Sequence, residues 1–393
     1  MGRLILIMSL LLTTLGVVRA DELDPFRIRF DDVAPAPRVI AIGDLHGDLR
    51  AAQKTLELAG AVDPRGNWVG RNLIVVQMGD IIDRGDSDLD LLNFLNRLES
   101  EAKEFQSLLI LLNGNHEYLN LQHRFDYASQ KSTAQFVHEF SWTLNYLLQL
   151  PEFRTPAPVL AAVGTSGPPW GFYANSLLDW EFDFEESPPL QSQGETIFQH
   201  YEKSNHPGLA ARATAFSPQS AYFEQLARRS YFAIVGDTVF VHGGILPKAL
   251  DYGLLRLQTE INKWLNPGIP LSAWLLTHHT KQAPLFLNEA DSPLWSRQYG
   301  QLPADPISFA EMTADYLDAC SDLQIVLERL AVKRMVVAHT IQPEREITSA
   351  CSGRVWRTDI GMSHGFSEPS PEYQILTIQK DEIEVLIRRK TST

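Results

Sequence analysis

The stretch Gly43-Asp44-Leu45-His46-Gly47-Asp48 is the first of three glycine-framed motifs in the first third of the chain. The second reads Gly79-Asp80-Ile81-Ile82-Asp83-Arg84-Gly85, and the third reads Gly114-Asn115-His116-Glu117. Each follows an apolar run typical of a buried strand, at residues 39–42, 73–76 and 108–112. Because ligands bind beyond the carboxyl ends of the strands in an α/β sheet, the pattern predicts an α/β fold with its site at these loops.

Four residues of these loops are of the types that bind divalent metals. Asp44 and His46 lie two positions apart, so an extended backbone places both side chains on one face. Asp80 and Asn115 follow the second and third strands. Carboxylates, neutral imidazoles and amide oxygens are ligands for hard or borderline cations, and glycines allow sharp turns and the close approach of a phosphate. The sequence therefore predicts a metal site.

Two further histidines follow apolar strands in the second half of the chain. Residues 231–241 read as a β-hairpin that ends at His242, and a short strand at 334–337 precedes His339. Both imidazoles are expected to join the site. The other elements predicted from periodicity are helices at 48–60, 86–98, 118–150, 200–229 (with a break at 206–208), 248–265 and 308–330, and antiparallel strands at 354–360, 373–379 and 383–387.

In this order the motifs resemble the PPP-type metallophosphatases of the calcineurin-like superfamily, particularly the bacterial-type Shewanella-like protein phosphatases. The resemblance includes Val241-His242-Gly243-Gly244 and Val336-Val337-Ala338-His339-Thr340, and it spans residues 38–362. It implies an α/β fold of the α+β sandwich kind, with two central mixed β-sheets flanked by helices. It also implies a large, mainly helical insertion or cap at about residues 118–230.

The resemblance further implies a centre of two divalent metal ions, for which manganese, iron and zinc are all compatible. Two such ions can generate a hydroxide and stabilise an in-line displacement at phosphorus. Direct attack on a phosphate monoester, without a covalent phosphoenzyme, is therefore expected. By the resemblance, one ion is held by Asp44, His46 and Asp80, and the other by Asp80, Asn115, His242 and His339.

Four residues receive catalytic roles from the same resemblance. His116 would protonate the departing oxygen, and Asp83 would orient it. Arg84 and Arg297 would grip the phosphoryl oxygens, because a guanidinium presents two parallel donors.

Other polar residues near the motifs have less specific interpretations. Asp48 and Glu117 could either orient the metal ligands or cap helices. His364 belongs to a loop, residues 359–363 and onward, that resembles a family loop near the site. The remaining histidines lack ligand spacing and are interpreted as structural: His123, His138, His200, His206, His278 and His279.

The two cysteines offer a competing motif. Cys351 and Arg357 match the Cys-x5-Arg loop of cysteine-dependent phosphatases. That chemistry needs a loop that opens into a helix and lowers the thiol pKa, whereas residues 355–358 read as a strand, so the match is interpreted as coincidence. Cys320 and Cys351 could form a disulfide or remain buried thiols.

The first twenty residues have the pattern of a secretory signal peptide. Arg3 precedes an apolar run, and Val18-Arg19-Ala20 forms a cleavage site before Asp21. The alternative is an uncleaved anchor, for which the run is marginally short. We expect an exported protein, periplasmic or secreted, with a lead-in at 21–37, a metallophosphatase domain at 38–393 and no stable membrane span after cleavage.

Composition limits the classes of partner. The chain has 393 residues, of which 44% are hydrophobic, and suits one large domain with an insertion. Cleavage would change the formal charge from −14 to −16 through the loss of Arg3 and Arg19, so nucleic acid is not an expected partner. The aromatic residues of the insertion are interpreted as its own core rather than as a substrate wall.

These observations predict a metal-dependent phosphoprotein phosphatase that acts on phosphoserine, phosphothreonine or phosphotyrosine in a protein or peptide. One alternative keeps the site and changes the substrate to a dinucleoside polyphosphate or another small metabolite. A pocket closed by the insertion would favour it, and an open groove would favour peptides. The other alternative is a phosphate-binding module without catalysis, against which the complete ligand set argues. The oligomeric state is left open.

Overall fold

The computed structural model describes residues 37–147, 207–218, 220–265, 283–305 and 312–390, together with Leu23, residues 26–29 and Ser308. The expected signal peptide, most of the lead-in and the middle of the insertion lie outside the described residues. So do His200, His206, His278 and His279, and the side chain of His138.

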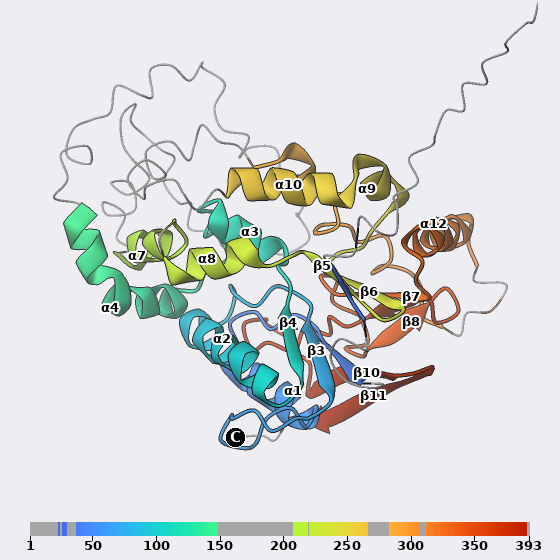
Figure 1. Ribbon diagram of the computed structural model, residues 1–393, viewed down its shortest axis with the longest axis horizontal. Coiled ribbons are helices and arrows are strands. Elements are labelled where there is room, and N and C mark those ends of the chain that lie inside the picture. Colours follow the sequence, from blue (N-terminus) through green and yellow to red (C-terminus); the bar gives the residue numbers. More distant parts are fainter. Residues whose placement is uncertain are drawn as a thin grey trace, which may run out of the picture.

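Two mixed β-sheets form the centre of the molecule and confirm the expected fold class (Figure 1). In the first sheet, three buried and mostly aliphatic strands run parallel, and an antiparallel pair extends one edge. The carboxyl ends of the parallel strands therefore lie together. In spatial order the strands are β11 (Glu382–Arg389), β10 (Glu372–Gln379), β2 (Arg38–Ile42), β3 (Leu73–Gln77) and β4 (Leu108–Leu111).

The second sheet contains the predicted hairpin, in which Val235 pairs with Thr238 across the turn. Strands β6, β7 and β9 run parallel, so their carboxyl ends also share an edge. Strands β1 and β8 were not predicted, because two or three residues are too few to show periodicity. In spatial order the strands are β1 (Arg27–Ile28), β5 (Phe232–Val235), β6 (Thr238–Val241), β7 (Arg334–Val337), β9 (Val355–Arg357) and β8 (Thr348–Ala350).

Helices flank the two sheets on opposite sides (Figure 1). Helix α1 begins after Asp48, whose carboxylate accepts a hydrogen bond from the backbone N–H of Ala51 at 2.8 Å. Among the described residues, no helix is long and apolar enough to cross a membrane. The helices beside the first sheet are α1 (Leu49–Leu58) and α2 (Asp88–Glu104), and those beside the second are α9 (Pro247–Tyr252), α10 (Leu254–Trp264), α12 (Ala314–Leu330) and the short 3-10 helix η6 (Leu285–Asn288).

The described part of the insertion is helical, but the continuous helix predicted over 118–150 is wrong. The chain forms α3 and α4 instead, because α3 ends in a left-handed turn at His123, with φ of 56°. There the backbone N–H of Arg124 donates to the carbonyl of Leu119 at 2.8 Å, as in a Schellman motif. The helices of this region are α3 (Asn115–Leu121), α4 (Gln130–Leu147), α7 (Pro207–Ala215) and α8 (Ala221–Arg228).

Other predicted boundaries also differ from the structure; α2, for example, extends to Glu104 rather than to residue 98. The helix expected over 248–265 is divided into α9 and α10 at Gly253, whose φ of 98° no α-helix contains. Helix α12 begins after Thr313, whose hydroxyl accepts from the backbone N–H of Tyr316, rather than at Ser308. Strand β9 ends at Arg357 and not at residue 360, which leaves Asp359 at the strand's end.

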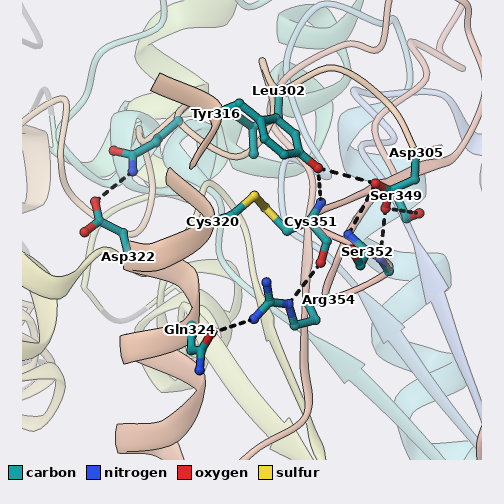
Figure 2. Close-up of a disulfide and its surroundings, with 12 residues drawn as sticks. Leu302, Asp305, Tyr316, Cys320, Asp322, Gln324, Ser349, Cys351, Ser352 and Arg354 are labelled. Atoms are coloured by element: carbon teal, nitrogen blue, oxygen red, sulfur yellow. Dashed lines mark hydrogen bonds between the residues drawn. A yellow bond between two sulfur atoms is a disulfide. The ribbon is translucent and has the colours of Figure 1, made fainter. Parts of the chain in front are cut away.

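Cys320 in α12 and Cys351 after β8 form a disulfide, with Cα atoms 5.5 Å apart (Figure 2). The pairing that the sequence left open is thus settled. Figure 2 also shows the hydroxyl of Tyr316 accepting a hydrogen bond from the backbone N–H of Cys351 at 3.0 Å. The guanidinium of Arg357 donates to Thr348 and to the carbonyl of Leu302. A disulfide sulfur is not a thiolate nucleophile, so the Cys-x5-Arg match is a coincidence.

Candidate metal centre

The carboxyl ends of strands from both sheets meet at one buried cluster. The first sheet contributes loops after β2, β3 and β4, and the second contributes the residues after β6 and β7. At most 7% of the surface of any predicted metal ligand is exposed. The residues brought together are Asp44, His46, Asp80, Asn115, His242 and His339.

Asp80 lies between the two halves of this cluster. Its Oδ2 is 3.6 Å from Nε2 of His46, and its Oδ1 is 3.3 Å from Nε2 of His242. Ligand atoms of Asp80, His242 and His339 lie within 4.8 Å of one another, and so do those of Asp80, His46 and His116. Asp80 is therefore shared by two groups of metal-ligand type.

The remaining predicted ligands border these two groups. Oδ2 of Asp44 is 3.8 Å from Nε2 of His46. Oδ1 of Asn115 is 2.9 Å from Nε2 of His242. Each half of the cluster thus combines imidazole nitrogen with carboxylate or amide oxygen, a donor set suited to manganese, iron or zinc.

The backbone fixes the orientation of the imidazoles. Nδ1 of His46 lies 3.2 Å from the carbonyl of Ile82, and Nδ1 of His242 lies 3.0 Å from that of Met78. A carbonyl can only accept, so Nδ1 carries a proton in both rings, and Nε2 is the nitrogen that faces the cluster. Nε2 of His339 is buried and has no hydrogen-bond partner among the described residues, a state that metal ligation would relieve.

Electrostatics also favour a bound cation. Burial raises the pKa of Asp44 well above its usual value, and the nearby Asp359 and Asp80 raise it further. Burial lowers the pKa of His46 and of His339 well below the usual histidine range, which keeps both imidazoles neutral. At His242, burial alone would lower the pKa, but the neighbouring carboxylate of Asp80 raises it above its usual value. The neutral imidazoles of His46 and His339, beside buried carboxylates, fit a site for divalent metals.

One carboxylate holds the loops after β3 and β4, and several site residues have strained backbone conformations. Glu117 is fully buried and accepts from the backbone N–H groups of Asp80, Ile81 and Gly114, at 2.7–2.8 Å. Its role is to fix the loops after β3 and β4. The site residues with left-handed φ are His46 (40°), Asp80 (51°), Asp83 (73°), Arg84 (67°) and His339 (64°).

His116 and Asp83 form a hydrogen-bonded pair beside the ligand cluster. Nδ1 of His116 lies 2.8 Å from Oδ2 of Asp83, both side chains being buried. Nε2 of His116 faces Oδ2 of Asp80 at 3.8 Å. The ring of His116 therefore lies between the carboxylate predicted to orient it and the cluster.

The two predicted phosphate-binding arginines also lie at the cluster. The guanidinium of Arg84 lies between the rings of Tyr127 and Phe366, 4.9 and 5.3 Å from their centroids. Its Nε is buried without a hydrogen-bond partner among the described residues. The exposed side chain of Arg297 donates to the carbonyl of His339 at 2.9 Å. Both guanidinium groups can therefore bind an anion.

Sequence reasoning assigned no role to several residues of the site. Asp359 is buried and hydrogen-bonded to Asp44, and it follows β9 as Asp44 follows β2, which was an available signal. Tyr127 and Phe366, which enclose Arg84, had no such signal. Neither had Arg212, a buried partner of Asp83.

Asp48 and His364, which the sequence left open, contact each other, and His123 has the structural role that the sequence predicted. Asp48 caps α1 through Oδ1, and its Oδ2 lies 2.8 Å from Nδ1 of the half-exposed His364. Nε2 of His123 lies 3.0 Å from the hydroxyl of Ser217.

Comparison with known proteins agrees with this geometry. Residues 37–162 match the family model described as calcineurin-like phosphoesterase. Shewanella-like protein phosphatase 2 of Arabidopsis thaliana is 32% identical over 346 residues, which cover 88% of this chain and 75% of that protein. Shewanella-like protein phosphatase 1 of Plasmodium berghei is 24% identical, with coverage of 88% and 73%.

Solved structures share the fold. A cold-active protein tyrosine phosphatase superposes with a TM-score of 0.52 at 17% identity, over 92% of this chain and 78% of that one. The enzyme of a psychrophilic Shewanella species gives 0.51 at 17% identity, over 92% and 82%. With a relative 32% identical over most of both chains, this protein belongs to the Shewanella-like protein phosphatases of the calcineurin-like phosphoesterase family, and it is a phosphatase.

Proposed function

We propose that this phosphatase removes phosphate from phosphoserine, phosphothreonine or phosphotyrosine in proteins, with two divalent metal ions at the buried cluster. The observation that carries the proposal is the sharing of Asp80 between two groups of ligand-type residues, one of which includes His116, the partner of Asp83. The names of the two relatives support a protein substrate. Bound metals would lower the pKa of water and neutralise phosphoryl oxygens, the chemistry of direct in-line hydrolysis.

The proposed ligands form two sets that share Asp80. One ion would take Asp44, His46 and Asp80. The other would take Asp80, Asn115, His242 and His339. Manganese, iron and zinc all suit these donors.

His116 would donate a proton from Nε2 to the departing oxygen as the phosphorus–oxygen bond breaks. Asp83 holds its Nδ1, so the ring is oriented before substrate binds. Water supplies the new oxygen of phosphate and returns a proton to His116, so the products are an alcohol or phenol and inorganic phosphate.

Arg84 and Arg297 would bind the phosphoryl oxygens. The rings of Tyr127 and Phe366 restrict the plane of the Arg84 guanidinium, so less entropy is lost when it binds. These contacts favour Arg84 as the more strongly organised of the two.

The test uses the chain from Asp21 with phosphopeptides that carry each phosphorylated residue, beside a dinucleoside polyphosphate. Hydrolysis is measured before chelation, after chelation and after manganese is restored. We expect phosphopeptide hydrolysis that disappears and returns. Preference for the dinucleotide would replace the protein substrate with a small metabolite, and activity that survives chelation would refute the metal mechanism.

We also propose that the protein is exported to an oxidising compartment. The disulfide supports this, because such bonds persist outside the reducing cytosol. Cell fractionation should find the protein in the periplasm or medium, with an N-terminus at Asp21 by peptide sequencing. A full-length chain in the cytosol would contradict export.

A further inference from the structure

Arg212 is a fully buried arginine in α7, within the insertion. Its Nη2 lies 2.7 Å from Oδ1 of Asp83 and 2.7 Å from Oδ2 of Asp88. Its Nε donates to Oδ1 of Asn120 at 2.8 Å, and its Nη1 donates to the hydroxyl of Ser132 at 2.9 Å. Every nitrogen of the guanidinium therefore has a partner.

The contact with Asp83 lies opposite His116 on the same carboxylate. Oδ1 accepts from Arg212, whereas Oδ2 accepts from Nδ1 of His116 and, at 2.9 Å, from Nδ2 of Asn120. Asn120 thus bonds to Asp83 and to Arg212 at once. The carboxylate cannot rotate without breaking charge-assisted hydrogen bonds on both oxygens.

Burial strengthens this arrangement. The rings of Phe125, Phe136 and Phe216 surround the guanidinium, with centroids 5.1–5.8 Å from its central carbon. Burial alone would raise the pKa of Asp83, but the hydrogen bond from His116 and the charge of Arg212 hold that pKa below its usual value. Because water is excluded, removing the guanidinium would leave Asp83 short of a partner that solvent cannot replace.

We propose that Arg212 is a positioning residue for proton donation, which fixes the Asp83 carboxylate and through it the ring of His116. The inference rests on the proposed function only in that His116 protonates the departing oxygen. It gives the insertion a role in catalysis, because α7 supplies Arg212 and α4 supplies Ser132. The insertion therefore acts on the proton donor indirectly, through Asp83.

The first test compares two aryl phosphates. Nitrophenolate departs from p-nitrophenyl phosphate without needing a proton, whereas the poorer leaving group of phenyl phosphate does need one. We expect Arg212→Met to lower kcat about 10- to 100-fold on phenyl phosphate and less than about 3-fold on p-nitrophenyl phosphate. Equal losses on both substrates would overturn the proposal and leave Arg212 a structural role.

Matched variants separate positioning from folding. Arg334 is another buried arginine, paired with Asp237 at the end of β7 opposite His339. Arg334→Met should lower both rates equally or leave them unchanged. Arg212→Lys keeps the positive charge but lacks the planar guanidinium with its several N–H donors. It should show the same selective loss of kcat on phenyl phosphate, by about 10-fold. The lysine variant decides the question if Arg212→Met does not fold.

A second readout needs neither metal nor turnover. The proton on Nδ1 of His116 should give a downfield NMR signal, assigned by its loss in His116→Asn. Arg212→Met should shift or abolish that signal, and Arg334→Met should leave it in place. An unchanged signal in Arg212→Met would refute the inference. Failure of the wild-type protein to hydrolyse any phosphate ester would instead refute the proposed function.

Discussion

At the scale of single residues, substitution of His116 is the most direct test of the proposed proton donation. His116→Asn keeps a polar side chain but cannot donate a proton from the position of Nε2. We expect kcat on phosphopeptides to fall about 10²- to 10⁴-fold, the usual contribution of a general acid. Metal content, measured by elemental analysis, should remain two ions per chain.

The outcome that would contradict this assignment is loss of metal in parallel with loss of activity. His116 lies within 4.8 Å of His46 and Asp80, so the geometry alone also allows it to be a ligand. His123→Asn is the matched control. That buried histidine bonds to Ser217 instead, and its substitution should leave both kcat and metal content unchanged.

The sequence predicted site residues where motif and strand end coincide. Asp44, Asp80 and His242 each follow an apolar strand, and parallel strands bring their carboxyl ends together. Arg212 and Phe366 show why the rest was missed. Their contacts depend on how distant segments pack, and neither residue has a spacing that distinguishes it from a surface arginine or a core aromatic.

At the scale of elements, Glu117 connects the loops that follow β3 and β4. Glu117→Gln would place an amide donor against backbone N–H groups that now share a carboxylate. We expect the free energy of unfolding to fall by about 1–3 kcal/mol, the cost of buried polar groups left unpaired. Metal affinity should fall as well, because Asp80 loses its support.

Denaturant unfolding and metal titration measure these two effects. Glu104→Gln, at the exposed end of α2, is the control and should change stability by less than about 0.5 kcal/mol. If Glu117→Gln behaves like this control, the carboxylate does not organise the loops.

The disulfide between α12 and the turn after β8 should contribute to stability and not to catalysis. A 31-residue separation predicts about 3–4 kcal/mol from loop closure in the unfolded chain. We therefore expect Cys320→Ser with Cys351→Ser to lower the denaturation midpoint while kcat is retained. Loss of activity in a folded double variant would mean that Cys351 takes part in catalysis after all.

Elements were predicted best where a short apolar run is bounded by turn residues. The apolar runs of β2, β3 and β4 and the hairpin of β5 and β6 were all located from the sequence. Helix breaks at His123 and Gly253 were not, because apolar periodicity continues across them while the backbone turns left-handed. At His123 the left-handed residue is not a glycine, so the sequence gives little sign of the break.

At the scale of the whole molecule, the centre joins the two sheets. Asp44 and Asp80 come from the first sheet, and His242 and His339 come from the second. Bound metals should therefore stabilise the fold, by about 2.7 kcal/mol for each ion when free metal exceeds its dissociation constant 100-fold. Chelation should lower the melting temperature, and added manganese should restore it. A melting temperature that chelation does not move would mean that no metal is held in the folded protein.

The pH dependence of the metal-free protein follows from the same geometry. Burial, with Asp359 and Asp80, raises the folded pKa of Asp44 well above 3.8. A raised pKa means that the folded state binds the proton more tightly than the unfolded chain. This stabilisation is full below about 3.8 and is lost as pH rises through the raised pKa. Above that raised pKa, the charged Asp44 therefore destabilises the metal-free fold.

The lowered pKa values of His46 and His339 have the opposite effect on how stability depends on pH, but both histidines are present in the wild type and in Asp44→Asn. Comparing the two proteins therefore isolates the contribution of Asp44. The variant should bind metal more weakly, yet without metal it should unfold at a higher temperature than the wild type at neutral pH. The difference should shrink as pH falls through the raised pKa of Asp44, where the wild-type carboxyl takes up its proton. Thermal unfolding in chelator across this pH range measures it. A metal-free wild type that is more stable than Asp44→Asn at neutral pH would show that the carboxylate is compensated within the protein, and that the cluster needs no cation to hold the two sheets together.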